Sequence, residues 1–315
     1  DKKQYYEESG TVFHTLYTIK YEAPHILTDK IDAELQKFNL SLNPFNPNSI
    51  IAKVNNNEAV EVDEWFTEVF NKSMEVSRNS DGVFDITCAP LVNLWGFGFN
   101  KKDSVTPAMI DSLKTFVGYR KVHLEGKKVV KDDPRLLLNC SAIAKGYSCD
   151  VIARLLEKEG VENYMILIGG EVVVKGVNQN GVCWRTGINL PEDDPDGIKN
   201  NYDEIVQLCK KGAIATSGNY RNFYIKDGKK YAHTIDPRTG YPAEQSVLSA
   251  TIVANDCMTA DAYATAFMAM GLEKARQMAD SLPEIEYYVI YADENGKHQI
   301  EYSKGMLQYL PKRKQ

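Results

Sequence analysis

Apolar side chains recur every three or four positions in several stretches of the chain, a spacing typical of amphipathic helices. The pattern predicts helices over residues 28–39, 62–77, 107–117, 144–159 and 257–270. In the fourth of these, Leu155 and Leu156 lie on the inward face and Gly160 ends the helix. The fifth is rich in Ala and Met and ends before Gly271.

Runs of β-branched and aromatic residues between these helices predict strands. They cover residues 136–138, 164–168, 172–174, 223–225, 231–235, 247–253, 287–291 and 299–302. Turn signals separate neighbouring runs, among them Gly169-Gly170, Asp227-Gly228 and Asn295-Gly296. Hairpin-connected strands interspersed with helices indicate an α+β fold with mixed, largely antiparallel sheets and packed helices. Residues 191–204 are expected to form an exposed loop.

Length and charge narrow the class of protein. The 315 residues, 43% of them hydrophobic, suit a single domain over 1–315 or two closely packed subdomains. A net charge of −6 without a block of basic residues argues against a nucleic acid partner, because clustered Lys and Arg hold phosphate backbones. No run of about 18 apolar residues occurs, so the sequence indicates a soluble chain without a membrane-spanning helix.

The cysteines give no sign of a zinc site or a disulfide framework. They occur at positions 88, 140, 149, 183, 209 and 257, and none forms a Cys-x-x-Cys pair. Several have apolar neighbours, where Cys usually acts as a small core residue. The sequence neither predicts nor excludes a disulfide between two of them.

The first candidate ligand site lies where the predicted strand 136–138 leads into a helix. Small residues surround Lys145 there, and free N–H groups at a helix start favour phosphate. The same pattern also suits a helix capped by Ser141 with a solvated Lys145, and locally that second interpretation is the commoner one. The spacing of a nucleotide-binding P-loop is absent.

The second candidate site lies on the predicted helix 257–270. Asp261 and Thr265 are four residues apart, so their oxygens share one helix face. A carboxylate with a hydroxyl suits Mg²⁺ that is shared with substrate phosphates. An exposed Asp261 and a Thr265 bonded to its own backbone would look the same, and exposed Asp is common. Neither residue is expected in the core.

Three further segments carry side chains that could take part in catalysis or ligand binding. His233 lies in a predicted strand and could act as a base near neutral pH, although a lone His more often only packs. Trp95, in an aromatic and Gly-rich loop, could stack on a flat ring or fill core. Thr216 and Ser217 offer hydroxyl groups before Gly218.

These segments belong to a series of six ordered motifs. They are Phe84-Asp85-Ile86-Thr87 leading to Leu91-Val92-Asn93-Leu94-Trp95-Gly96-Phe97-Gly98, then Ala142-Ile143-Ala144-Lys145-Gly146-Tyr147, Ile168-Gly169-Gly170, Ala215-Thr216-Ser217-Gly218, His233-Thr234-Ile235-Asp236-Pro237-Arg238-Thr239-Gly240 and Thr259-Ala260-Asp261-Ala262. In order and spacing the chain resembles the ApbE-type FAD:protein FMN transferases, once called thiamine-biosynthesis lipoproteins, over about residues 10–275. Each motif is weak alone, but six in order are specific.

The resemblance implies an activity with two substrates. FAD and Mg²⁺ are used to attach FMN, through a phosphoester, to a Ser or Thr of a flavin-carrying protein of the respiratory or redox type, and AMP is released. The FAD site would lie within one ApbE-like domain or between two packed subdomains. The family's usual export implies an extracytoplasmic location on the periplasmic side of a bacterial membrane, with a lipid anchor upstream of Asp1 as the only membrane contact.

The resemblance also assigns roles to residues of this chain. Asp261 and Thr265 would bind the metal through their side chains, and Ala142 through its backbone carbonyl. His233 is the candidate base and, with Asp261, a catalytic residue. The residues expected to contact FAD are Phe13, Leu94, Trp95, Gly96, Asn139, Lys145, Thr216, Ser217 and Ile235.

Two positions depart from the family pattern. Asn139 stands where the family usually has Asp, which keeps hydrogen bonding possible but removes a negative charge. Phe13-His14-Thr15 replaces the preferred Met-Gly-Thr, so flavin contacts there are expected to differ. Neither departure removes a proposed metal oxygen.

Two other functions would use the same motifs. If water were the acceptor, the chain would be an FAD pyrophosphatase that yields FMN and AMP, and product analysis would separate the two enzymes. A non-catalytic FAD-binding lipoprotein is the other possibility. The presence of Asp261 and Thr265 argues against it, because storage does not require a metal at the pyrophosphate.

Overall fold

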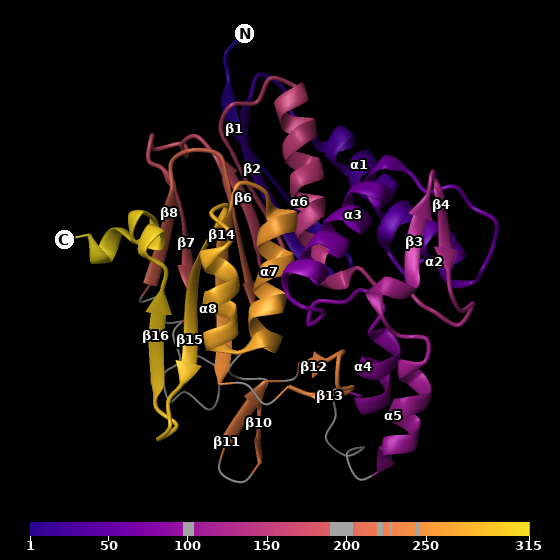
Figure 1. Ribbon diagram of the computed structural model, residues 1–315. Helices are drawn as coiled ribbons and strands as arrows, with labels where there is room; N and C mark the ends of the chain where they lie inside the picture. Colours follow the sequence, from indigo (N-terminus) through magenta and orange to yellow (C-terminus); the bar gives the residue numbers. More distant parts are fainter. Residues whose placement is uncertain are drawn as a thin grey trace.

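The computed structural model describes residues 1–96, 104–189, 204–218, 223–226, 229–232, 234–243 and 246–314. Its centre is an eight-stranded sheet in which every pair of neighbouring strands is antiparallel (Figure 1). The strands are, in spatial order, β1 (Gln4–Val12), β2 (Thr15–Ala23), β5 (Tyr164–Ile168), β6 (Glu171–Lys175), β9 (Gly212–Ser217), β14 (Val247–Ala254), β15 (Ile285–Ala292) and β16 (His298–Tyr302). The predicted α+β class with largely antiparallel sheets is confirmed.

The remaining strands form two-stranded hairpins. These pair β3 (Val122–Glu125) with β4 (Lys128–Lys131), β7 (Trp184–Ile188) with β8 (Glu204–Leu208), β10 (Phe223–Lys226) with β11 (Lys229–Ala232), and β12 (Ile235–Asp236) with β13 (Tyr241–Pro242). The β7–β8 hairpin carries a disulfide between Cys183 and Cys209. The cysteine spacing had left this bond open, because the two residues are 26 positions apart and only the hairpin brings them together.

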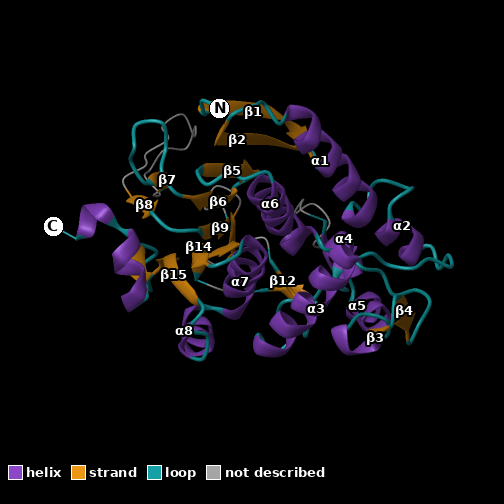
Figure 2. Ribbon diagram, turned by 90° about the horizontal axis from the view of Figure 1, so that it is seen from above, coloured by secondary structure: helices purple, strands orange, loops and turns teal. Residues whose placement is uncertain are grey.

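Helices cover one face of the central sheet. Those that contact its strands most are α6 (Ser141–Lys158), α7 (Cys257–Met270) and α8 (Leu272–Asp280). The other helices of the described residues are α1 (Thr28–Leu42), α2 (Ile50–Asn55), α3 (Glu64–Asn79), α4 (Ala89–Trp95) and α5 (Pro107–Lys114), with short 3-10 helices at Tyr119–Lys121, Lys304–Tyr309 and Pro311–Arg313. Seen from above, α6 and α7 lie side by side on this face, and the β7–β8 hairpin lies on the other (Figure 2). Two apolar layers, one on each face, therefore share the sheet.

Helix α7 is buried on almost every side. Twelve of its fourteen residues are buried, because it packs against the sheet, α3 and α6 at once. A helix in that position needs apolar or small residues all round. This accounts for its Ala- and Met-rich sequence. Within the described ranges, no helix is both long enough and apolar enough to cross a membrane.

Two sequence predictions differ from the structure near α6. The helix begins at Ser141, three residues earlier than predicted. Residues 136–138 form no strand, because the backbone of Leu138 pairs with the side chain of Asn55 instead of with another strand. The predicted strand 231–235 is also divided, since β11 ends at Ala232 and Ile235 begins β12. Most of the predicted loop 191–204 lies outside the described residues.

Candidate ligand site

Helices α6 and α7 approach each other tightly at Gly146. A Cβ atom at this position would lie 2.4 Å from the carbonyl oxygen of Cys257 and 2.7 Å from Cβ of Asp261. Only glycine allows this approach. The Gly146 N–H donates a hydrogen bond of 3.0 Å to Oδ2 of Asp261, so the contact between the helices also fixes the direction of the carboxylate.

Asp261 is buried, with 5% of its surface exposed. The prediction that it lies outside the core is wrong, and so is the alternative of an exposed helix charge. Burial is the largest cause that raises the pKa of Asp261, and the negative charge of Glu171 raises it further. The Gly146 N–H and the charge of Lys145 act in the opposite direction. A cation at this place would relieve the remaining cost of a buried carboxylate.

Glu171 is a second buried carboxylate that the sequence patterns did not single out. It is the first residue of β6, and the Gly170 N–H donates a hydrogen bond of 3.3 Å to Oε2. Burial raises the pKa of Glu171 to about 7, partly offset by Lys145. Successive side chains of a strand alternate between its faces, and Val172 packs on the hairpin face of β6 and Val173 on the helix face. Glu171 therefore lies on the helix face.

Thr265 and Ser217 place two hydroxyl groups beside this helix face. Oγ1 of Thr265 donates to the backbone carbonyl of Asp261 at 3.3 Å and lies 3.3 Å from Oγ of Ser217. The preceding residue, Thr216, points to the opposite face of the sheet and bonds Oγ1 of Thr251 at 2.8 Å. The structure thus brings Ser217 to the helix side but not Thr216.

The start of α6 is held by Asn139. Its Oδ1 accepts a hydrogen bond of 2.9 Å from the Ser141 N–H. The interpretation of Ser141 as the helix cap is therefore wrong, because Ser141 is the first helical residue and Asn139 satisfies its N–H. Ala142 and Lys145 follow within the first two turns, and both are half-buried.

An aromatic pocket of about 130 Å³ adjoins Lys145. The turn between β1 and β2 forms one wall, and Phe13 and His14 both take positive φ angles there, 53° and 59°. The ring of Phe13 lies 5.4 Å from that of Phe38, and the ring of His14 lies 6.2 Å from that of Phe45. Such a pocket suits a flat ring. Phe45 is exposed over 72% of its surface and was not predicted, because a single aromatic residue in a loop carries no pattern.

Leu94, Trp95 and Ile235 lie together in another place. They pack with α5 around Leu91, near the β12–β13 hairpin in Figure 1. Nε1 of Trp95 donates a hydrogen bond of 2.7 Å to the Gly240 carbonyl. Both predicted uses of Trp95 remain compatible with this geometry, since the ring is anchored by its edge and only half-buried. Gly96 follows directly, whereas His233, Phe97 and Gly98 lie outside the described residues.

The site combines a buried pair of carboxylates, a lysine at a helix start, hydroxyl groups and a pocket lined by rings. This combination suits a ligand with both charged groups and a flat ring system. The comparison with known proteins agrees. Residues 13–289 match the ApbE family, and the chain belongs to that family.

Named relatives cover most of the chain. A FAD:protein FMN transferase from Vibrio cholerae is 37% identical over 284 residues, which is 87% of this chain and 84% of the relative. One from Escherichia coli is 33% identical over 261 residues, 80% of this chain and 73% of the relative. The solved structure of the flavin transferase ApbE from Vibrio cholerae is similar with a TM-score of 0.85 at 33% identity, covering 98% of this chain and all of that one.

Proposed function

We propose that this chain transfers FMN from FAD to a Ser or Thr hydroxyl of an acceptor protein and releases AMP. The observation that carries the proposal is the buried carboxylate of Asp261 beside Glu171 and Lys145, in a chain whose relatives are named FAD:protein FMN transferases. Lys145 offers a positive charge to the pyrophosphate of FAD. The pocket beside Phe13 and Phe45 offers aromatic surface to the flavin ring.

The residues around Asp261 fit a Mg²⁺ ion. The Gly146 N–H would ordinarily bond the Ala142 carbonyl one turn earlier, but here it donates to Asp261. In the proposed site the Ala142 carbonyl oxygen, which competes with Asp261 for this N–H, joins the Asp261 carboxylate and the Thr265 hydroxyl as a set of hard oxygen donors. The described residues hold no cluster of three or more His, Cys, Asp or Glu side chains suited to a metal. A metal at this site would therefore take its remaining ligands from substrate phosphates and water, as Mg²⁺ usually does.

A bound Mg²⁺ would neutralise charge on the pyrophosphate as AMP departs. The protein itself positions the acceptor hydroxyl at the pyrophosphate and excludes water from it. In the transfer, the acceptor oxygen forms a bond to the phosphorus of FMN, the bond to the AMP oxygen breaks, and the hydroxyl proton passes to a base. We propose His233 as this base on the basis of the family resemblance.

The experiment that tests the function is incubation with FAD, Mg²⁺ and a panel of Thr-bearing peptides, followed by mass spectrometry. Covalent FMN on a peptide with one AMP released per adduct supports transfer. Free FMN and AMP without an adduct would replace the proposal with FAD hydrolysis. Absence of AMP under all conditions would indicate a binding protein.

We also propose a location outside the cytoplasm with a lipid anchor upstream of Asp1. The disulfide between Cys183 and Cys209 supports it, because such bonds persist in oxidising compartments. Fractionation of cells that express the full-length gene, with a labelled fatty acid, tests this. Recovery of the unlabelled protein in the cytoplasm would contradict it.

A further inference from the structure

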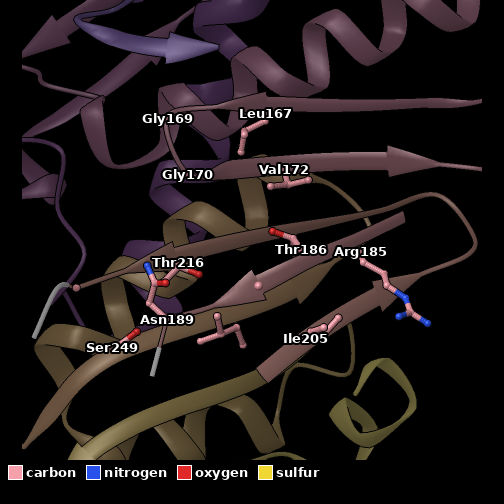
Figure 3. A pocket seen from close by; sticks show the side chains of 13 residues that line it. Leu167, Gly169, Gly170, Val172, Arg185, Thr186, Asn189, Ile205, Thr216 and Ser249 are labelled. Atoms are coloured by element: carbon pink, nitrogen blue, oxygen red, sulfur yellow. The ribbon is translucent and has the colours of Figure 1, made fainter. Parts of the chain in front are cut away.

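A second cavity, of about 740 Å³, lies on the sheet face opposite α6 and α7. Figure 3 shows its lining side chains, which come from the central sheet on one side and from the β7–β8 hairpin on the other. Thr186 stands between Trp184 and Ile188, two residues that pack against the sheet, so its side chain points into the gap. The volume is within the usual range for a ligand site.

This cavity and the candidate ligand site share a wall. Thr216 lines the cavity, while the next residue, Ser217, lies beside Thr265 on the helix face. The turn Gly169-Gly170 also borders the cavity, and Glu171 directly after it belongs to the helix face. A peptide segment bound in the cavity therefore needs to pass only the end of β9 to reach the carboxylates of Asp261 and Glu171.

The end of β9 extends beyond its ladder with β6 at this border. The ladder between β6 and β9 stops at Val172 and Ile214, because β6 begins at Glu171. Residues 215–217 of β9 continue to pair with β14 on their other side. Among the described residues, they have no strand partner on the β6 side, and such an edge accepts an extended peptide.

The lining chemistry differs from that of the aromatic pocket. Among the described lining residues the cavity has no aromatic ring, and Arg185 is its one charged side chain. The rest are glycines, aliphatic residues and hydroxyl or amide groups such as Thr186 and Asn189. Flavin and adenine rings would find no stacking partner there, whereas a peptide backbone would find hydrogen-bonding groups.

We infer that the acceptor protein docks its hydroxyl-bearing segment in this cavity as an extended strand along residues 215–217 of β9. Its Ser or Thr then reaches past the Gly169-Gly170 turn to FAD on the helix side. Thr216 contacts the acceptor in this arrangement and not FAD. The inference rests on the proposed transfer and adds to it a separate entrance for the second substrate.

The test fills the cavity from β7, whose Thr186 side chain points inward, with Thr186→Trp and the smaller Thr186→Leu as separate variants. Gln179→Trp adds the same ring on an exposed turn before β7 and serves as the control. The probe is the peptide that the wild-type chain modifies fastest. For each variant we would measure the peptide's KM, FAD affinity by calorimetry, AMP release without peptide, and the melting temperature.

The expected result is a rise of at least about tenfold in the peptide's KM for both cavity variants. FAD affinity, AMP release without peptide and melting temperature should match those of Gln179→Trp. An unchanged KM in a folded variant, or a loss of FAD affinity in its place, would overturn the inference. If the wild-type chain modifies no peptide and no protein acceptor, the proposed function itself fails, which is a separate outcome.

Discussion

Asp150 is a buried carboxylate that holds the start of α7. It accepts hydrogen bonds of 2.8 Å from the backbone N–H groups of Cys257 and Met258. Burial, together with the charge of Asp256, raises the pKa of Asp150 to about 7 against the lowering effect of the two N–H groups and of Arg154. The helix that carries Asp261 and Thr265 is therefore anchored by a group that titrates near neutral pH.

This anchor predicts a pH dependence of stability. Because the folded-state pKa of Asp150 lies above its ordinary value, its stabilising contribution is complete at about pH 4 and is lost as the pH rises through about 7. Asp150→Asn removes this titration. The free energy of unfolding of the variant, relative to wild type, should therefore rise between pH 5 and 8, measured by urea titration at about five pH values in this window. A difference that stays constant with pH would contradict the assignment.

A helical spacing let the sequence place two candidate site residues on one helix face. Asp261 and Thr265 stand four positions apart on a predicted helix, and in the structure Asp261 bonds Gly146 of α6 while Thr265 lies beside Ser217 at the end of β9. Glu171 and Phe45 could not be found in this way. Their roles depend on a strand start and a loop that meet other elements only in three dimensions.

At the scale of elements, the contact of α6 with α7 depends on one glycine. Gly146→Ala places a methyl group 2.4 Å from the Cys257 carbonyl, so the helices must separate. Alanine gains about 1 kcal/mol of helix propensity, but overpacking costs about 1–3 kcal/mol and the carboxylate of Asp261 shifts. We expect lower stability together with weaker Mg²⁺ dependence of AMP release.

Gly170→Ala is the matched control for this substitution. A Cβ at Gly170 meets nothing within 4 Å, so its melting temperature should equal that of wild type. A Gly146→Ala variant that is as stable as Gly170→Ala and as active as wild type would show that the close approach of α6 and α7 is not required.

The disulfide of the β7–β8 hairpin makes a second prediction at this scale. Its loop spans 26 positions, and the chain-entropy estimate for a loop of that length is about 3.5 kcal/mol. Replacing Cys183 and Cys209 by Ser should lower the free energy of unfolding by an amount of that order, seen by denaturant titration. Cys88→Ser, which alters a half-buried free thiol, should change it less. Identical curves for the double variant and wild type would count against a structural role for the bond.

Local sequence predicts some boundaries of helices and strands but not others. Helix α7 has the predicted bounds, because a long Ala- and Met-rich run ends at glycine. The supposed strand 136–138 failed because the Asn55 side chain, 83 positions from Leu138, takes the backbone bonds that a strand would use. No local pattern could reveal this partner.

At the scale of the whole molecule, the sites that we assign to FAD are spread over several elements. They include the aromatic pocket near the β1–β2 turn, the start of α6, α7, and the cluster around Trp95. Because FMN lacks the AMP half, it can occupy only part of this set. FAD should therefore bind more tightly than FMN in isothermal calorimetry with Mg²⁺ present, and equal affinities would contradict this distribution of contacts.

The proposed transfer mechanism depends on the carboxylate of Asp261. Asp261→Asn keeps an acceptor for the Gly146 N–H, so the variant should fold, but it removes the negative charge. Loss of one such electrostatic contact in catalysis commonly costs about a hundredfold in rate. Thr265→Val should cost less, because water can replace a neutral hydroxyl ligand.

The decisive measurement is AMP release and FMN transfer by wild type, Asp261→Asn and Thr265→Val across a Mg²⁺ titration. We predict a drop of about a hundredfold and a higher Mg²⁺ requirement for Asp261→Asn, with a smaller shift of the same kind for Thr265→Val. Full activity of Asp261→Asn with an unchanged Mg²⁺ dependence would place the metal elsewhere and contradict the proposed mechanism.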